Sequence, residues 1–227
     1  MIIVKDVSKS YAGHDGTVNA LVSANVTIEN GEFVLIVGRS GSGKSTLLSI
    51  LGGLTRPSRG KVELDGEDLW SMSDAELSQV RSREIGFVFQ FPGLLPTLNA
   101  LENVMLPVMF SAREGREEAA ERAKALLNSV GLADKHGSYP NQLSGGELKR
   151  AAIARALMNG PSIILADEPT GDLDVKTELE IMQMLQEINQ QGRTVVMVTH
   201  NPDLSTFATR VLRMDKGRIM DAGADLV

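Results

Sequence analysis

The stretch Gly38-Arg39-Ser40-Gly41-Ser42-Gly43-Lys44-Ser45-Thr46 decides how the rest of this chain is arranged. It matches the phosphate-binding pattern Gly-x-x-x-x-Gly-Lys-[Ser/Thr]; the apolar run 33–37 before it predicts a buried strand, and the run 45–51 after it is compatible with a helix. Glycines let backbone N–H groups turn toward phosphate oxygens, and a helix start presents partial positive charge to an anion. We therefore predict a nucleotide site in which Lys44 reaches the β- and γ-phosphates and the Ser45 hydroxyl binds Mg²⁺. The alternative, a glycine-rich turn that binds nothing, is disfavoured by the flanking strand and helix.

The composition limits what else the chain can be. It has 227 residues, 23 Lys and Arg against 29 Asp and Glu for a net charge of −6, and no cysteine. This length fits one α/β domain or a domain with a subdomain. The acidic balance argues against a general nucleic-acid binder, and the lack of cysteine excludes disulfides and thiolate metal sites. No apolar run approaches the roughly 20 residues that span a bilayer, and the N-terminus does not look like a signal peptide, so we expect a cytoplasmic chain that reaches a membrane only through a partner.

Short β-rich runs and turns make up the first part of the chain. Strands are expected at 2–7, 20–28 and 33–37, and Asn30-Gly31 indicates a hairpin between the last two. Tyr11 follows the first of these runs, where it could stack on an adenine base or simply pack under a loop; its position alone leaves both open. Later strands alternate with helices, which predicts a mainly parallel sheet with a β-rich N-terminal portion.

Residues 91–110 are unusual in composition. Four of the six phenylalanines lie between positions 87 and 110, and the segment is interrupted by prolines that include Pro107. Such a segment is not expected to form one regular element. Its apolar side chains indicate either a surface on which a partner docks or the core of a small helical subdomain.

A second helix start appears at 143–147, Leu-Ser-Gly-Gly-Glu. Ser144 is a plausible N-cap, and the two glycines after it would let another group approach the helix N–H donors. This pattern predicts a second anion-binding helix start. A later helix is expected from Asp174, with an apolar stripe of Val175, Leu179, Met182, Leu185 and Ile188.

Polar side chains follow the predicted buried strands. Asp167 and Glu168 end the strand at 162–168, and because adjacent strand residues face opposite ways, they are expected to do different work. In a phosphate-loop protein Asp167 would hold Mg²⁺ through water and Glu168 would polarise the attacking water. Gln90 could orient water or contact Mg²⁺, or be a solvated strand end. His200 follows another strand, at the edge where the phosphate site lies.

The chain resembles the nucleotide-binding subunit of ATP-binding cassette transporters over essentially its full length. The segments GRSGSGKST, LSGGE, ILADE and GDLD and then His200 occur in that family's order, and FVFQFPGLLPTLNALENV with ADEPTGDLD resembles the ATPases of lipoprotein-release and macrolide-export permeases. The resemblance implies an α/β fold of the P-loop NTPase (RecA-like) type, a mainly parallel sheet with an N-terminal antiparallel β portion. Residues 1–90 and 160–227 would form the catalytic core, and residues 91–159 an inserted α-helical subdomain carrying the LSGGE signature.

The resemblance also implies roles at the chain's own nucleotide site. Tyr11 is similar to the adenine-stacking aromatic, and Gln90 to the glutamine that joins the γ-phosphate site to the membrane partner. Glu168 is similar to the catalytic base and His200 to the switch histidine. ATP and Mg²⁺ are the cofactors implied, with Mg²⁺ held by Ser45, Gln90 and Asp167.

Other residues are implied to act across a homodimer. Ser144, Gly145 and Gly146, with Glu147 where the commonest signature has Gln, would cover the γ-phosphate of ATP held by a second copy, and Asp174 would contact that copy. Residues 91–107 lie where an integral-membrane permease would dock, which places the chain on the inner face of the cell membrane.

The function implied is ATP hydrolysis in a head-to-tail homodimer that drives an export permease. The alternative is a regulatory or structural ATPase of the cell-division type, which acts on a membrane partner without moving a solute. The signature segments do not separate the two, and a nucleic-acid partner is not expected.

Overall fold

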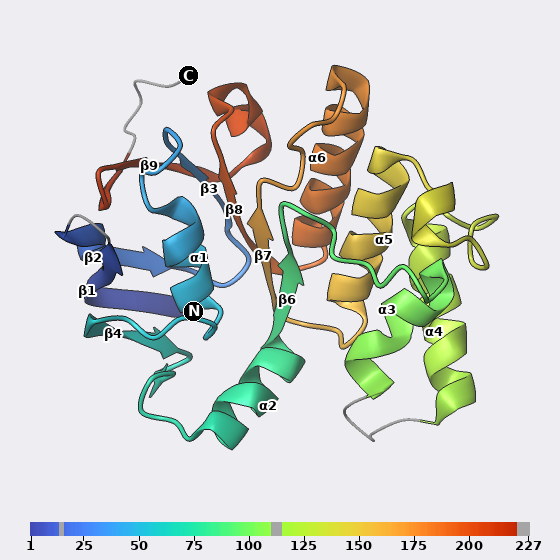
Figure 1. The fold of residues 1–227 in the computed structure, drawn as a ribbon, viewed down its shortest axis with the longest axis horizontal. Coiled ribbons are helices and arrows are strands. Elements are labelled where there is room, and N and C mark those ends of the chain that lie inside the picture. The colour runs from blue at the N-terminus through green and yellow to red at the C-terminus, as the bar shows by residue number, and fades with distance from the viewer. Residues whose placement is uncertain (14–15, 110–114, 222–227) are drawn as a thin grey trace.

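Two sheets of different kinds lie on either side of helix α1, Lys44–Leu51 (Figure 1). The structure is a computed structural model that describes residues 1–13, 16–109 and 115–221. The antiparallel sheet has the order β2-β1-β4-β5, formed by β1 Ile2–Gly13, β2 Gly16–Ile28, β4 Arg59–Leu64 and β5 Glu67–Asp68.

The second sheet has the order β10-β9-β3-β8-β7-β6. Its strands are β3 Phe33–Val37, β6 Ile85–Val88, β7 Ile163–Asp167, β8 Thr194–Thr199, β9 Arg210–Asp215 and β10 Arg218–Asp221. Neighbouring strands from β6 to β9 are parallel, and the β9–β10 hairpin adds an antiparallel edge. The predicted mainly parallel sheet with an N-terminal antiparallel portion is confirmed.

Alternation along the central strands divides the core into two layers. Val34 and Ile36 of β3 pack toward α1 and the antiparallel sheet, whereas Phe33, Leu35 and Val37 pack toward the helices on the opposite face. Those helices are α3 Ala100–Met109, α4 Arg116–Ser129, α5 Gly145–Leu157 and α6 Val175–Gln190. Because both faces are covered, the strands are apolar throughout, as is typical of parallel sheets.

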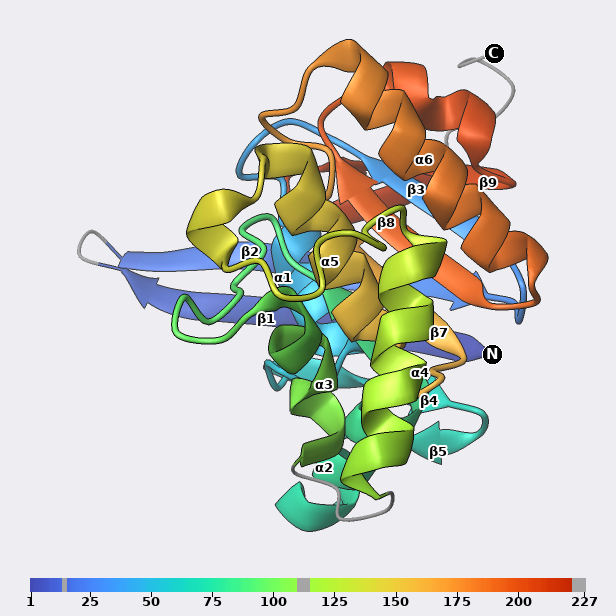
Figure 2. The ribbon, with the colours of Figure 1, turned by 90° about the vertical axis from the view of Figure 1, so that its right-hand side faces the viewer.

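The helices α3, α4 and α5 pack on one another at one end of the molecule, where Figure 2 shows them in front of the sheet. A short 3₁₀ helix, η1 Pro140–Gln142, precedes α5, and α2 Asp74–Glu84 lies before β6. Since α5 packs on β6 as well as on α3 and α4, it belongs to both parts of the fold. The division of the chain at residues 90 and 160 therefore stays a prediction.

Two local expectations are wrong. Gly31 does form a turn, with φ of 79°, but β2 and β3 belong to different sheets, so Asn30-Gly31 joins two layers and closes no hairpin. The hairpin is β1–β2, in which Gly13 is paired with Gly16. Tyr11 is within β1, opposite Val18, rather than after it. The segment 91–110 is not one regular element, as expected, because α3 begins only at Ala100; Pro107 lies inside its last turn, where the helix lacks the hydrogen bond that an N–H would donate.

A buried side chain holds the part of the irregular segment that lies next to α3. Asn103 is fully buried; its Oδ1 accepts from the N–H of Leu95 at 2.7 Å, and its Nδ2 donates to the carbonyl oxygens of Leu95, Leu98 and Asn99 at 3.1, 2.9 and 3.0 Å. Among the described ranges, no helix is long and apolar enough to cross a membrane.

Candidate active site

The phosphate loop is wedged between the two sheets. A Cβ at Gly38 would lie 2.4 Å from the carbonyl oxygen of Met214 in β9, and a Cβ at Gly43 would lie 2.2 Å from the carbonyl oxygen of Ala20 in β2. Gly43 also has φ of 102°, which only glycine adopts at low cost. These two glycines are therefore required by the close approach of backbone from both sheets.

Lys44 opens α1 directly after the loop. Its side chain is 7% exposed, and its ammonium donates to the carbonyl oxygens of Gly38 at 2.7 Å and Arg39 at 3.3 Å. The buried Ser42 hydroxyl has no hydrogen-bond partner among the described residues. An unpaired buried hydroxyl costs about 1–3 kcal/mol, so this loop suits a ligand that supplies oxygen acceptors, as a phosphate does.

A groove of about 630 Å³ runs along the loop and collects most of the predicted site residues. Tyr11 and Val18 of the β1–β2 hairpin form one end of it, and Gln90, Glu168 and His200 form the other. Tyr11 is 42% exposed, with the ammonium of Lys9 5.0 Å from its ring centroid. A flat aromatic surface and a phosphate loop thus face the same groove, which is the arrangement expected for a nucleotide.

Asp167 lies at the carboxyl end of β7 and meets the start of α1. Its Oδ1 accepts a hydrogen bond from the Ser45 hydroxyl at 3.0 Å. Burial raises the pKa of the Asp167 carboxyl, opposed by the Ser45 hydrogen bond, and neighbouring Glu168 raises it further. Two hard oxygen donors beside a phosphate site fit Mg²⁺, which is usually held by one or two protein groups together with phosphates and waters.

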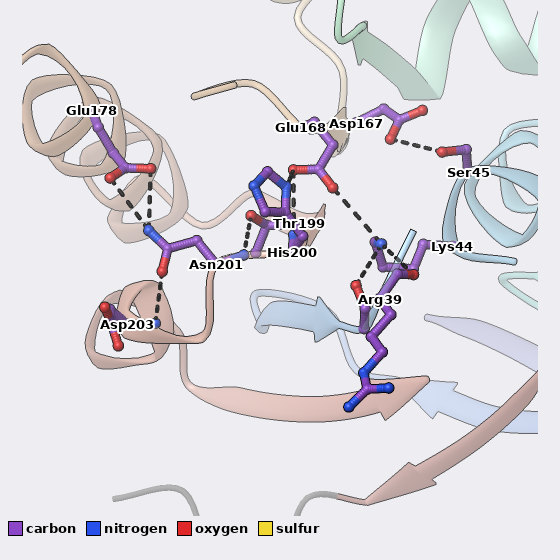
Figure 3. A network of polar contacts seen from close by, with 11 residues as sticks. Arg39, Lys44, Ser45, Asp167, Glu168, Glu178, Thr199, His200, Asn201 and Asp203 are labelled. Carbon is purple, nitrogen blue, oxygen red and sulfur yellow. Dashed lines mark hydrogen bonds and ion pairs between the residues drawn. The ribbon is translucent and has the colours of Figure 1, made fainter. Parts of the chain in front are cut away.

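Glu168 has left the strand and reaches the loop by a strained turn. Its φ is 45°, in the left-handed region, so its direction is set by this turn and not by strand alternation as expected. One carboxylate oxygen lies 3.7 Å from the ammonium of Lys44, and the other is 2.9 Å from Nδ1 of His200 (Figure 3). The backbone N–H of His200 also donates to the second oxygen, at 3.3 Å.

The His200 loop is held by its neighbour Asn201. The side-chain amide of Asn201 donates to both carboxylate oxygens of Glu178 in α6, at 3.4 and 3.3 Å, and its Oδ1 accepts from the N–H of Asp203 at 3.0 Å (Figure 3). The latter bond caps η2, Pro202–Phe207. The His200 ring, 69% exposed, thus projects from a fixed loop toward Glu168.

Gln90 lies two residues beyond the end of β6 and lines the groove. Its backbone carbonyl accepts a hydrogen bond from the ammonium of Lys149, a residue of α5 that is 4% exposed. Lys149 was not among the site residues predicted from the sequence. The sequence does contain a signal for its burial. Lys149 precedes the apolar residues Ala152 and Ile153 by three and four positions, so it lies on the apolar stripe of α5.

The predicted second helix start is α5, and the expected N-cap Ser144 is confirmed. Ser144 is its N-cap; the Ser144 hydroxyl accepts from the N–H of Glu147 at 3.3 Å, and the Glu147 carboxylate accepts from the N–H of Ser144 at 2.7 Å. These hydrogen bonds lower the pKa of Glu147. Glu147 thus closes a capping box and also lies 3.5 Å from the ammonium of Lys135.

The two glycines of this helix start are not equivalent. A Cβ at Gly146 would lie 2.6 Å from Cγ2 of Thr177, whereas a Cβ at Gly145 would meet nothing closer than 3.6 Å. Asp174 is the N-cap of α6, accepting from the N–H of Thr177 at 3.1 Å and from its hydroxyl at 2.6 Å. The expected open approach beside both glycines is therefore wrong for Gly146, which packs on the start of α6.

The chain is similar to known proteins over nearly its whole length. Residues 21–171 match a family model described as ABC transporter. The chain is 45% identical over 221 residues to the lipoprotein-releasing system ATP-binding protein LolD of Geobacter metallireducens, covering 97% of this chain and 98% of that protein. It is 46% identical over 220 residues to the macrolide export ATP-binding/permease protein MacB of Sodalis glossinidius, covering 97% of this chain and 34% of that protein.

The fold is also similar to that of a solved structure, described as a dimeric post-hydrolysis state of the ATP-binding cassette MJ0796 bound to ADP and Pi. The TM-score is 0.90 at 44% identity, and the match covers 97% of this chain and 98% of the other.

Proposed function

Since the chain belongs to the ABC transporter family and is an ATPase of its cassette type, we propose that two copies close head to tail around two ATP·Mg²⁺ and reopen on hydrolysis to drive an export permease. One observation carries the proposal most directly. Glu168 lies between Lys44 and His200 at the phosphate loop. A carboxylate that can accept a proton, an ammonium and an imidazole therefore lie together where a γ-phosphate would bind.

The proposed reaction is direct attack of water on the γ-phosphate. Glu168 accepts the proton of the water as its oxygen bonds to phosphorus, while the bond to the β-phosphate oxygen breaks and ADP leaves. Lys44 turns from the loop carbonyls to the phosphates, and His200 donates to the γ-phosphate. Mg²⁺ held by Ser45, Gln90 and Asp167 would supply positive charge against the phosphate oxygens.

The second copy would complete the site through the start of α5. Ser144 and Gly145 are exposed at a helix N-terminus, the kind of structure that binds an anion, and Asp174 caps the adjacent helix α6. Neither Ser144 nor Gly145 lines the groove that holds the phosphate loop. A dimeric relative bound to ADP and Pi supports the inference that these groups serve the nucleotide of a partner copy.

A permease would dock beside the Gln90 segment. Phe89 and Phe91 are 43% and 75% exposed, and Phe89 stacks on Phe87 with ring centroids 5.3 Å apart. Phe87 and Phe89 line a groove of about 590 Å³ that extends to Leu54 and Pro107. Exposed apolar side chains around a groove suit a protein partner, and the names of the relatives support export of the lipoprotein or macrolide type.

The test is Glu168→Gln. We expect ATP turnover to fall by roughly 10²–10⁴-fold, because a positioned base is lost, while ATP binding at the loop is kept. With ATP and Mg²⁺ the variant should also elute as a dimer in size-exclusion chromatography, since hydrolysis no longer reopens it. A Glu168→Gln protein that stayed monomeric with ATP and Mg²⁺ would contradict the head-to-tail dimer.

A further inference from the structure

Lys149 is a buried cation that the proposed mechanism does not use. It lies in the second turn of α5, 4% exposed, and its ammonium donates to the backbone carbonyl of Gln90. Placing an ammonium in a protein interior is costly unless it is hydrogen-bonded and its charge is compensated. Lys149 therefore needs partners beyond one carbonyl.

Negative charges at the active site supply part of that compensation through electrostatics. Burial lowers the pKa of Lys149, and the negative charges of Asp172, Glu168 and Asp167 oppose this by raising it. Two of these residues, Glu168 and Asp172, have positive φ values of 45° and 66°, so the turn after β7 that carries these carboxylates is strained. The buried ammonium of Lys149 therefore lies in the electrostatic field of the carboxylates of this turn.

Lys149 also lies on the helix whose start is Ser144. Its ammonium bonds the Gln90 carbonyl of its own chain, whereas Ser144 and Gly145 are exposed at the N-terminus of the same helix. A helix transmits a displacement of its start because its turns are rigidly bonded. Any shift of α5 on contact with a partner copy must therefore shift the ammonium beside Gln90 and Glu168.

We propose that Lys149 is a positioning residue for hydrolysis: its buried ammonium fixes the Gln90 backbone against the carboxylates after β7 and makes their placement depend on α5. The inference rests on the proposed roles of Glu168 and Gln90. Lys149 does not line the nucleotide groove, so it acts on the rate of hydrolysis and not on the binding of ATP.

Arg155 provides a comparison on the same helix. Its guanidinium donates to the carbonyl oxygens of Gly93 at 2.7 Å and Pro92 at 2.6 Å, so it fastens the segment that follows Gln90. No carboxylate contributes to the pKa of Arg155, which burial alone lowers. Loss of Arg155 would loosen the segment without removing a charge from beside Glu168.

The experiment compares Lys149→Met, Lys149→Arg and Arg155→Met with Glu168→Gln in the full chain. For Lys149→Met we expect kcat for ATP to fall on the order of 10- to 100-fold, the size of effect that follows from misplaced catalytic groups, with KM for ATP within twofold of wild type. Lys149→Arg, which keeps the charge, should recover most of kcat. Arg155→Met should lower the thermal midpoint with a smaller loss of kcat. Circular dichroism melts identify the folded fraction to which each rate is normalised.

Each remaining outcome decides against the proposal. A Lys149→Met protein with wild-type kcat would overturn it, and so would Lys149→Arg and Lys149→Met losing kcat equally, because charge would then not matter. Equal losses in Arg155→Met and Lys149→Met would assign the effect to a loosened segment. If Glu168→Gln kept its activity, the proposed base would fail whatever Lys149 does, so the two failures are distinguishable.

Discussion

Gly146 at the start of α5 touches Thr177 at the start of α6 so closely that a methyl group there would lie 2.6 Å from Cγ2 of Thr177. The same threonine donates its hydroxyl to the N-cap Asp174 at 2.6 Å. The two helix starts proposed to meet a second copy are therefore packed against each other within one chain, which keeps Ser144 and Asp174 in a fixed relation.

The first prediction concerns this contact. Gly146→Ala should lower the free energy of unfolding by roughly 1–3 kcal/mol, the usual cost of overpacking, whereas Gly145→Ala should not, since its methyl would meet nothing closer than 3.6 Å. Thermal unfolding measures both. Adding Thr177→Ser to Gly146→Ala removes Cγ2, keeps the hydroxyl that bonds Asp174, and should restore most of the stability. Equal midpoints for Gly145→Ala and Gly146→Ala would refute the steric explanation.

The second prediction separates two roles of Asp174. As the N-cap of α6 it is replaceable by Asn, so Asp174→Ala should cost about 1 kcal/mol of stability and Asp174→Asn close to nothing. If Asp174 also acts across the dimer, Asp174→Asn should still hydrolyse ATP more slowly than wild type, because its charge is gone. Denaturant unfolding measures the capping role, and steady-state ATPase rates measure the role across the dimer. If Asp174→Asn were fully active, the charge of Asp174 would have no role across the dimer.

The third prediction follows from the buried carboxyl of Asp167. Burial raises its pKa above the ordinary value of 3.8, so the folded protein binds this proton more tightly than the unfolded chain does. Stability from Asp167 is then present at low pH and lost as pH rises from 3.8 through the raised value. Nucleotide-free Asp167→Asn should therefore be more stable than wild type at pH 7, with a difference that shrinks toward pH ~4.

This comparison is made in EDTA by thermal melts across pH, and the other acids cancel in the difference between the two proteins. Asn can still accept the hydrogen bond from Ser45. With ATP and Mg²⁺ added, the order should reverse, because Asp167→Asn gains less from binding. A constant difference at every pH would count against the burial of the charge as its cause.

The fourth prediction tests Tyr11 as a surface for the base. Tyr11→Ala should weaken ATP binding by about 1–3 kcal/mol, the usual value of a stacked base, whereas Tyr11→Phe should bind nearly as well as wild type. Tyr139→Ala is the matched control, because Tyr139 is similarly exposed at 44% but does not line the groove. Nucleotide titration by calorimetry gives all four affinities. Equal affinities for Tyr11→Ala and wild type would place the base elsewhere.

Local signals in the sequence predicted local structure well. The N-cap Ser144 of α5 and the start of α6 at Asp174 are confirmed, because helix caps depend on a few adjacent residues. Asn30-Gly31 was misread for a different reason. A turn signal predicts that the chain reverses direction. It does not predict which strands pair, because that depends on how both sheets bury their apolar faces around α1.

Contacts between distant segments were the part that sequence could not supply. The stripe predicted for α6 included Val175, yet Val175 is 73% exposed, and Ile181, which the stripe did not include, is fully buried. Thr177 had no sequence feature that pointed to Gly146. The phosphate loop and the polar ends of β7 and β8 were predictable because parallel strands bring their carboxyl ends to one edge.

The wedging of the phosphate loop between Ala20 and Met214 has an entropic consequence. Ordering the backbone of one residue costs about 1–2 kcal/mol of conformational entropy. The loop is ordered when the two sheets assemble, so this entropy loss occurs on folding and not on ATP binding. Affinity for ATP thus depends on the assembly of segments near opposite ends of the chain, including the contact in which the N–H of Val22 donates to the carbonyl of Gly217 at 2.9 Å. A chain truncated before β9 would retain every residue of the loop and yet bind nucleotide weakly.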